Sequence, residues 1–274
     1  MNASGKQIII TSGKWNIFGF LNVYAYRELV WMFIWRDVHV RYKQTLLGIL
    51  WVLFQPLIMM VIFTIFFGMI IKVPSAGLPY AVFFLSGNII WLLFYEGVTR
   101  SYSGILSNTA IITKVYFPRI ILPVAGVIAP LVDFCIASCI MIALILVYGL
   151  PVSYTVVMIP LLVVWVMVLA LGIGSFMSAL NVKYRDIQYA LPFMLLLWGY
   201  VSPVIYPASL IPVNYHWIYY LNPMAWIIDG MRFSLFGIPL SSESVIPALV
   251  ITIVIVITGV VFFEYHERRF ADYI

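Results

Sequence analysis

Two long apolar runs dominate this chain. The run from Ile120 to Val182 contains one charged residue, Asp133, and the run from Ile187 to Ile228 contains none. A helix of about 20 consecutive apolar residues is long enough to cross the hydrocarbon core of a bilayer. Only 9% of the residues are charged and the mean hydropathy is +1.08, against about 25% charged residues in an average soluble domain. We therefore expect an all-α integral membrane protein.

Turn and proline signals divide these runs into spans. Gly149-Leu150-Pro151 is a strong turn sequence that splits the first run in two. The second run carries five prolines, which break helices because they lack a backbone donor. We infer one crossing there, followed by broken helical pieces over 203–232 that re-enter the membrane where protein or water shields their backbone. The six predicted spans are about 47–71, 80–99, 120–148, 155–180, 187–205 and 244–263.

The distribution of basic residues predicts the orientation of these spans. Six spans place both termini on one side, and all fifteen Lys and Arg residues except Lys72 and Arg232 then share that side. Basic residues are retained on the cytoplasmic side, so we expect residues 1–26 and the tail 264–274 to be cytoplasmic. This bias also accounts for the basic balance, so nucleic-acid binding is not implied. A seven-span arrangement fits the charges almost as well, and the prolines favour six.

The segment 27–46 before the first span has a helical pattern. Its aromatic and aliphatic residues recur at helical spacing, and its polar residues fall on another face. Such a helix lies in the membrane surface with its aromatic side chains at headgroup depth. A simple membrane anchor would explain the pattern equally well. The residues of the apolar face are Trp31, Ile34, Trp35, Val38 and Tyr42.

Catalytic and nucleotide-binding patterns are absent from the sequence. The phosphate-binding pattern G-x-x-x-x-G-K-[ST] does not occur, and the three histidines lie in separate segments without metal-ligand spacing. We expect no catalytic residue, metal or cofactor in this chain. Asp133 is expected to be a hydrogen-bonded packing residue rather than a proton carrier, and Asp229 is expected to pair with Arg232 three residues further on.

Several ordered motifs resemble a known family, the permease subunit of bacterial polysaccharide ABC exporters of the ABC-2 type. Proteins of this family move O-antigen, capsule or teichoic-acid chains. The resemblance covers about residues 30–274, with the motifs in order. They are RDVHVRYKQTLLGILWVLFQPL (36–57), NTAIITKVYFPRIILP (108–123), ALNVKYRDIQYALPF (179–193), SPVIYPASLIP (202–212) and YLNPMAWIIDGMR (220–232).

The resemblance implies an assembly and a transport cycle. Such permeases are homodimers of six-span subunits in the bacterial cytoplasmic (inner) membrane. They pair with two copies of a cytoplasmic ATPase, which binds ATP and Mg²⁺. A lipid-diphosphate-linked polysaccharide passes outward between the two permeases. In the family, short helices between spans five and six form an outer gate, which here corresponds to Pro207, Pro212, Asn222 and Pro223.

The resemblance also places the ATPase contact in the loop between spans two and three. This loop is unusually apolar for a solvated connection, which favours docking over a plain loop. The expected coupling residues are Ile111, Ile112, Lys114, Val115, Tyr116, Phe117 and Arg119.

Arg41 and Lys43 stand where a diphosphate headgroup would meet the first span. Arginine offers a bidentate fork to phosphate oxygens. Anchoring of the chain to anionic lipid is an equally good explanation of both residues.

Aromatic residues are expected to line the glycan path, because the C–H faces of sugars pack on aromatic rings. Trp and Tyr also favour membrane interfaces, so only some of this group would line it. The candidates are Trp91, Phe94, Tyr95, Trp198, Tyr200 and Tyr206.

Two other functions remain open from the sequence. An ABC-2 exporter of teichoic acid, a drug or a small lipid would share the fold and differ in its cargo. An integral-membrane glycan transferase would need a cluster of acidic or histidine residues, whereas the sequence offers scattered single residues. A neighbouring gene for an ATPase beside glycosyltransferase genes would favour the polysaccharide exporter.

Overall fold

The computed structural model describes residues 24–43, 50–240, 244–267 and 270. Within these ranges the regular structure is entirely helical. Most of the predicted N-terminal segment 1–26, residues 44–46 of the predicted amphipathic helix and most of the tail lie outside the described residues.

The helices follow one another along the chain as a series of long apolar segments separated by short ones. They are α1 (Arg27–Lys43), α2 (Leu50–Phe63), the π-helix η2 (Thr64–Ile70), α3 (Tyr80–Ser107), α4 (Thr109–Ile112), α5 (Ile121–Ile128), α6 (Leu131–Tyr148), the 3₁₀ helix η3 (Tyr154–Met158), α7 (Ile159–Lys183), α8 (Ile187–Val201), the 3₁₀ helices η4 (Ala208–Leu210) and η5 (Val213–Tyr215), α9 (His216–Tyr220), α10 (Pro223–Phe236) and α11 (Val245–Glu267).

Five described segments are long and apolar enough to cross a membrane: Leu50–Ile70, Tyr80–Ser107, Ile121–Tyr148, Tyr154–Lys183 and Val245–Glu267. The fifth predicted span corresponds to α8, an apolar helix of 15 residues. At about 1.5 Å per residue, a helix of 15 residues is shorter than the thickness of the hydrocarbon core, which is about 30 Å. The count of six spans therefore stays a prediction.

The boundaries of two predicted spans differ from the helices. The second predicted span ends near residue 99, whereas α3 continues to Ser107 because Ser101, Tyr102 and Ile105 are still buried against neighbouring helices. The third predicted span is divided into α5 and α6 just before Leu131, because Pro130 has no N–H to continue the helix. The predicted turn at Gly149 is confirmed, and Gly149 has the left-handed backbone with φ of 61°.

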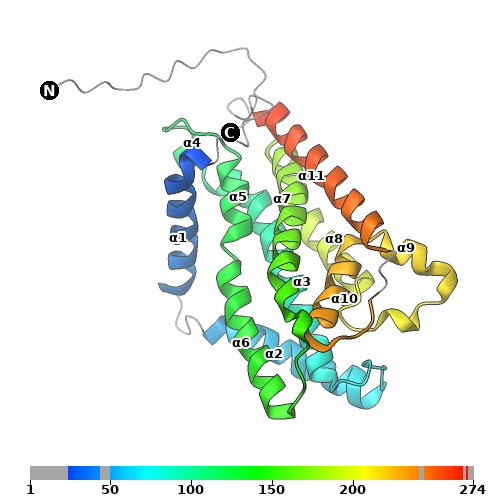
Figure 1. Ribbon diagram of the computed structural model, residues 1–274. Coiled ribbons are helices and arrows are strands. Elements are labelled where there is room, and N and C mark those ends of the chain that lie inside the picture. The colour runs from blue at the N-terminus through cyan, green and yellow to red at the C-terminus, as the bar shows by residue number, and fades with distance from the viewer. Residues whose placement is uncertain (1–23, 44–49, 241–243, 268–269, 271–274) are drawn as a thin grey trace.

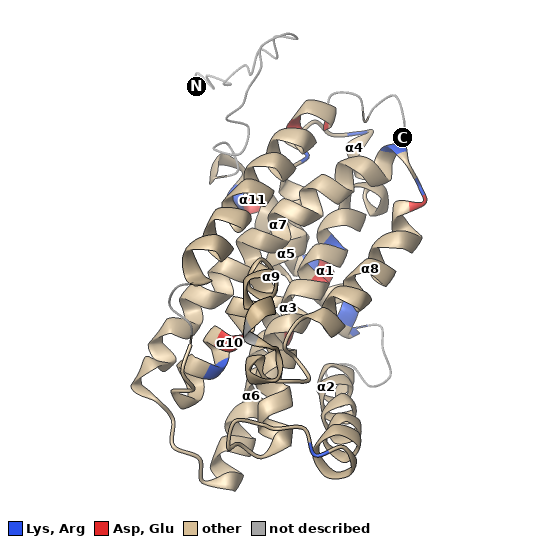
Figure 2. Cartoon of the chain, turned by 90° about the vertical axis from the view of Figure 1, so that its right-hand side faces the viewer, with Lys and Arg blue, Asp and Glu red and all other residues tan. Residues whose placement is uncertain are grey.

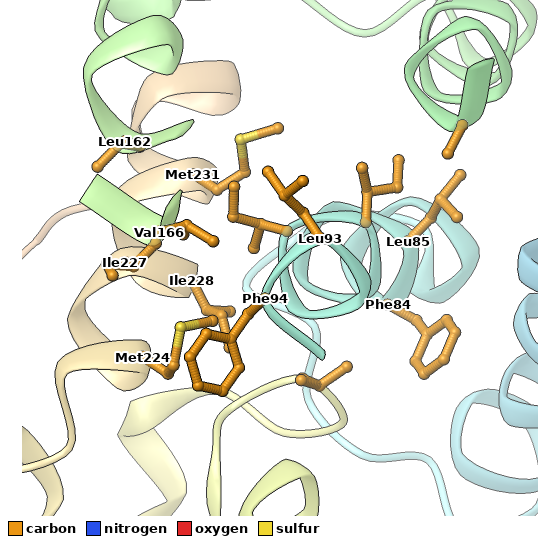
Figure 3. Packing of buried hydrophobic residues seen from close by; sticks show 14 of the residues in the cluster. Phe84, Leu85, Leu93, Phe94, Leu162, Val166, Met224, Ile227, Ile228 and Met231 are labelled. Carbon is orange, nitrogen blue, oxygen red and sulfur yellow. The ribbon is translucent and has the colours of Figure 1, made fainter. Parts of the chain in front are cut away.

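Helix α3 forms the centre of the molecule. In its most apolar part 72% of the residues are buried inside the chain, against 17–33% in the other four candidate spans. Figure 3 shows Phe94 and Leu93 of α3 facing Val166 of α7 and Ile228 of α10. A helix that is apolar on all sides is suited to such a central position.

Helices α7 and α11 meet backbone to backbone at two glycines. A Cβ atom added to Gly259 would lie 2.0 Å from the carbonyl oxygen of Gly172. A Cβ atom added to Gly172 would lie 2.8 Å from Cα of Val256. Small residues let membrane helices approach this closely. The close contact between α7 and α11 therefore requires glycine at both positions.

Helices α1 and α2 pack against different parts of the helical bundle. Figure 1 shows α1 running lengthwise beside α5, not flat across the bundle, and α2 with η2 crossing the end opposite α4. Helix α1 buries Val30, Phe33 and Ile34, while Trp31 and Trp35 of the predicted face are 63% and 56% exposed. Both faces of α1 carry apolar residues, and α5 takes the one that contains Phe33. The described contacts therefore leave Trp31 and Trp35 on the surface, and the contact of this face with the membrane stays a prediction.

Candidate functional site

Charged side chains from three helices meet in one cluster. Arg41 of α1 forms an ion pair with Asp133 of α6, and its Nη1 lies 3.5 Å from Oε2 of Glu96 on α3. Arg100 Nε donates to Oε2 of Glu96 over 3.1 Å, and its Nη2 lies 3.8 Å from Oδ2 of Asp133. Figure 2 shows blue and red segments side by side near the α1 label. The prediction that Asp133 is a hydrogen-bonded packing residue is confirmed.

The break before α6 positions Asp133. This carboxylate lies in the first turn of α6, where the helix dipole favours a negative charge. Its side chain is only 9% exposed, so it needs partners. Tyr42 also donates its hydroxyl to Asp133. Burial, and then this hydrogen bond, raise the pKa of the Tyr42 phenol above its ordinary value, so Tyr42 stays a donor.

An open recess of about 490 Å³ lies beside this cluster. It is lined by Arg36, Asp37, Val40, Arg41 and Arg100. Of the two residues predicted to bind a diphosphate, the structure places Arg41 at the recess, whereas Lys43 is exposed at the end of α1 and is not among the lining residues.

Sequence reasoning missed Arg36 and Arg100 as lining residues. Arg100 was assigned to a loop, but α3 extends beyond it. The i,i+4 spacing of Glu96 and Arg100 was the signal that could have placed both on one helix.

The charges of this site balance. Together with Glu96 and Asp133 behind the recess, the lining residues supply three guanidinium groups and three carboxylates. A buried or half-buried cluster that is neutral as a whole costs less desolvation than an unbalanced one. An anion that enters the recess must therefore compete with carboxylates for the arginines.

The segment 108–119 contains the predicted ATPase contact and is called the docking segment after that prediction. It lies against α1. Arg36 Nη1 donates to Oδ1 of Asn108 over 2.5 Å, and the rings of Phe33 and Phe117 are 5.7 Å apart. The backbone N–H of Arg119 donates to Oε1 of Glu267 over 2.7 Å, which ties the segment to the end of α11.

Only part of the docking segment is exposed. Phe117 is buried, and Ile111 and Ile112 pack partly against the α1 and α5 cluster. Lys114, Val115 and Tyr116 are exposed. The chain itself therefore covers much of the apolar surface that the sequence suggested was free for a partner.

The aromatic candidates for the glycan path differ in how deeply their side chains are buried. Phe94 is completely buried, with the ring centroids of Trp91 and Trp198 at 5.4 Å and 5.2 Å from its own. Trp91, Tyr95 and Trp198 are half-buried, whereas Tyr200 is 55% exposed. The half-buried Tyr206 donates its hydroxyl to the carbonyl of Val201 over 2.6 Å.

The proline-rich segment 202–223, which contains the predicted outer gate and is called the outer segment after that prediction, is closed by hydrogen bonds at its two ends. Asn222 Oδ1 accepts from Trp198 Nε1 over 2.9 Å, and its Nδ2 donates to Oγ of Ser202 over 2.9 Å. Asn222 also caps α10, accepting from the N–H of Met224, and Pro223 occupies the first position of that helix. Pro207 precedes η4 directly, and Pro212 precedes η5.

Arg232 of α10 is the most deeply buried charged residue among those described. It is 2% exposed, and its Nη2 donates to the carbonyls of Val204 and Phe83 over 3.1 Å and 3.3 Å. Its guanidinium carbon lies 3.7 Å from the centre of the Phe83 ring. Nη1 pairs with Oδ1 of Asp229 over 3.4 Å. The predicted Asp229–Arg232 pair is confirmed; sequence reasoning missed its burial.

The five long apolar helices and the all-helical structure of the described residues define a multi-span α-helical membrane protein. Among the described residues, no group of three or more His, Cys, Asp and Glu side chains is arranged to hold a metal ion.

The particular family follows from comparison with known proteins. The model of the ABC-2 type transporter family matches residues 28–236, more than half of the chain. The chain therefore belongs to the ABC-2 type transporter family.

Individual relatives match over nearly their whole length. An O-antigen export system permease protein RfbA of Klebsiella pneumoniae is 28% identical over 238 residues, 86% of this chain and 91% of the relative. The RfbA protein of Myxococcus xanthus is 27% identical over 253 residues, 91% of this chain and 96% of the relative. The polysialic acid transport protein KpsM of Escherichia coli is 25% identical over 221 residues, 78% of this chain and 80% of the relative.

Proposed function

We propose that this chain is the membrane subunit of an ATP-driven exporter that moves a lipid-diphosphate-linked polysaccharide, of O-antigen type, outward across the bacterial cytoplasmic membrane. The observation that carries the proposal is the end-to-end similarity to O-antigen export permeases. The similarity to a polysialic acid transport protein supports the same general class of cargo, a long glycan.

The proposed assembly contains two copies of this chain and two copies of a cytoplasmic ATPase. Both termini of each permease face the cytoplasm. The ATPase docks on the exposed part of the docking segment, residues Lys114, Val115 and Tyr116. It supplies the ATP and Mg²⁺ chemistry, because the present sequence has no phosphate-binding loop. The glycan passes along Trp91, Tyr95 and Trp198 towards the outer gate.

In this proposal the diphosphate headgroup binds at the recess between α1 and α3. Guanidinium groups bind phosphate oxygens through two parallel hydrogen bonds. Three such groups, from Arg36, Arg41 and Arg100, face or border the recess. Lys43 lies in the same last turn of α1 as Arg41, and it adds a positive charge near the entrance of the recess. Because the recess is neutral before the ligand arrives, the headgroup binds by taking over arginines from their carboxylate partners.

The test compares two double variants in cells that make the glycan. Replacement of Arg41 and Lys43 by Glu is expected to reduce export more than their replacement by Gln, because repulsion of the diphosphate adds to the loss of its donors. The readout is the lipid-linked glycan that accumulates on the cytoplasmic side.

The insertion and level of both double variants are checked by protease accessibility, because these charges also orient the first span. Full export by a correctly inserted double Glu variant would reject the headgroup site. Normal glycan export in cells that lack this chain altogether would reject the exporter function.

A further inference from the structure

One guanidinium group belongs both to the wall of the recess and to the docking segment. Arg36 lines the recess, and its Nη1 donates to Oδ1 of Asn108 over 2.5 Å. Asn108 directly precedes α4, the short helix of the docking segment. The distance along the chain between Arg36 and Asn108 is 72 residues, so the fold itself brings them together.

Asn108 lies at the junction of α3 and α4, where its side chain bonds α3 and Arg36 and its backbone carbonyl bonds α4. It is buried, with 6% of its surface exposed. Its Nδ2 donates to the carbonyl of Gly104 over 2.7 Å, in the last turn of α3. Its own backbone carbonyl accepts from the N–H groups of Ile111 and Ile112 over 3.0 Å and 3.1 Å. A change at the Asn108 side chain is therefore a change at the junction of α3 and α4.

The three arginines at the recess differ in where their carboxylate partners lie. Arg41 and Arg100 pair with Glu96 and Asp133, which do not line the recess. Arg36 pairs with Asp37, with Nη2 at 2.8 Å from Oδ1, and Asp37 is itself a lining residue.

An incoming anion meets Asp37 directly and repels it. Like charges at short range repel each other strongly at the effective dielectric of a protein surface. Arg36 is therefore the guanidinium most easily transferred from its present partners to a ligand.

We propose that Arg36 is a positioning residue that reports occupancy of the recess to the docking segment. An anionic diphosphate in the recess draws the guanidinium of Arg36 away from Asp37 and Asn108. Asn108 then loses its donor, and the start of α4, where the ATPase is proposed to dock, becomes free to shift. This inference rests on the proposed function and adds to it a regulatory link, by which the loaded permease raises ATP hydrolysis.

The experiment uses the complete complex of this chain with its ATPase, reconstituted in lipid nanodiscs. Binding of radiolabelled farnesyl diphosphate and its effect on ATP hydrolysis are measured on the same samples. Farnesol and inorganic diphosphate are the two controls for the ligand, because they separate the apolar tail from the phosphate group. We expect farnesyl diphosphate to bind the wild-type complex and to raise its hydrolysis rate.

Two substitutions of Asn108 are expected to act in opposite directions. Asn108→Ala removes the acceptor of Arg36, so the complex should still bind farnesyl diphosphate but lose the ligand-dependent increase in hydrolysis. Asn108→Asp strengthens the bond with a charge, so a higher concentration of farnesyl diphosphate should be needed for half of the increase. Ser107→Ala is the matched control, because Ser107 is exposed and its hydroxyl bonds only the carbonyl of Ser103 among the interactions described.

The outcomes separate the inference from the function on which it rests. An unchanged increase and an unchanged half-maximal concentration in both Asn108 variants would overturn the link while leaving the diphosphate site in place. Binding to the wild-type complex without any change in hydrolysis would also overturn the link. Absence of binding to the wild-type complex would reject the diphosphate site itself. If Asn108→Ala does not assemble, the shift expected for Asn108→Asp decides.

Discussion

At the scale of single residues, the structure shows how a membrane protein keeps charges at low cost. Asp133 has Arg41, Arg100 and Tyr42 around it, and Arg232 has one carboxylate, two carbonyls and an aromatic face. The partners of Asp133 come from α1 and α3, whereas those of Arg232 come from α10 itself, from α3 and from the turn after α8. Each charge therefore connects separate parts of the chain, and we expect its removal to lower the stability of the whole fold.

Replacement of Asp133 by Asn is expected to destabilise the chain. The variant keeps the size of the side chain but leaves Arg41 and Arg100 with Glu96 as their shared carboxylate. Hydrogen bonds to charged groups are worth about 1.5–3 kcal/mol, and we expect a loss in that range. The measurement is the midpoint of thermal unfolding in detergent. An unchanged midpoint would show that the α1–α6 tie carries no net stability.

Replacement of Arg232 by Met is expected to cost more, about 3–5 kcal/mol, because it leaves the largely buried Asp229, with a side chain 14% exposed, without its cation. The double replacement of Arg232 by Met and Asp229 by Leu should recover part of this loss, since no buried charge is then stranded. Thermal unfolding of the double variant and of the single variants Arg232→Met and Asp229→Leu provides the comparison. A double variant that is as unstable as the sum of its two single variants would argue against the pair as the cause.

At the scale of elements, the docking segment shows what a sequence pattern leaves undecided. The run Val115-Tyr116-Phe117 is uniformly apolar, but Tyr116 is 71% exposed and Phe117 is 4% exposed. The pattern alone cannot show which of these side chains the chain buries itself, because α1, which covers Phe117, is more than 70 residues away in sequence.

Single Asp substitutions should separate the two roles. Tyr116→Asp is expected to weaken co-purification of the ATPase while leaving the unfolding midpoint of the permease unchanged. Phe117→Asp should lower that midpoint, because it places a carboxylate against Phe33 in a buried cluster. Equal retention of the ATPase by the Tyr116→Asp variant and the wild type would contradict docking at this surface.

The limits of prediction from sequence follow the same division. The helical class, the turn at Gly149 and the Asp229–Arg232 pair were predictable, because each depends on neighbours in the sequence. The recess was only half predicted: Arg41 was found from its place before the first span, whereas Arg36 and Arg100 meet it through contacts between helices. The apolar face of α1 that packs on α5 could not be chosen from the sequence, because α1 carries apolar residues on two faces.

At the scale of the whole molecule, the proposed glycan path depends on a few aromatic side chains between α3 and α8. Trp198 packs edge-on against Phe94 and donates to Asn222 at the start of α10. It therefore combines a ring surface with a hydrogen bond to the outer segment, and these two properties can be separated by mutation.

We expect Trp198→Ala to slow glycan export severalfold without changing basal ATP hydrolysis by the complex. Trp198→Phe keeps a ring for sugar packing and removes only the N–H donor to Asn222, so its export should lie nearer the wild-type rate. Export is measured as glycan that reaches the outer face per unit time. Tyr154→Ala, at an exposed position outside the candidate set, is the control, and equal slowing of export by all three variants would contradict a specific role of the Trp198 ring.

The contact of Gly172 with Gly259 has a consequence for measuring motion. The backbones of α7 and α11 are in direct contact at these two glycines, so there is no space between the helices for relative movement. We therefore expect α7 and α11 to move as one rigid unit. Spin labels placed on these two helices would then hold a constant separation through every state of the transport cycle. The α7–α11 pair can therefore serve as a fixed reference for measuring displacements of α1, α4 and the proline-rich segment.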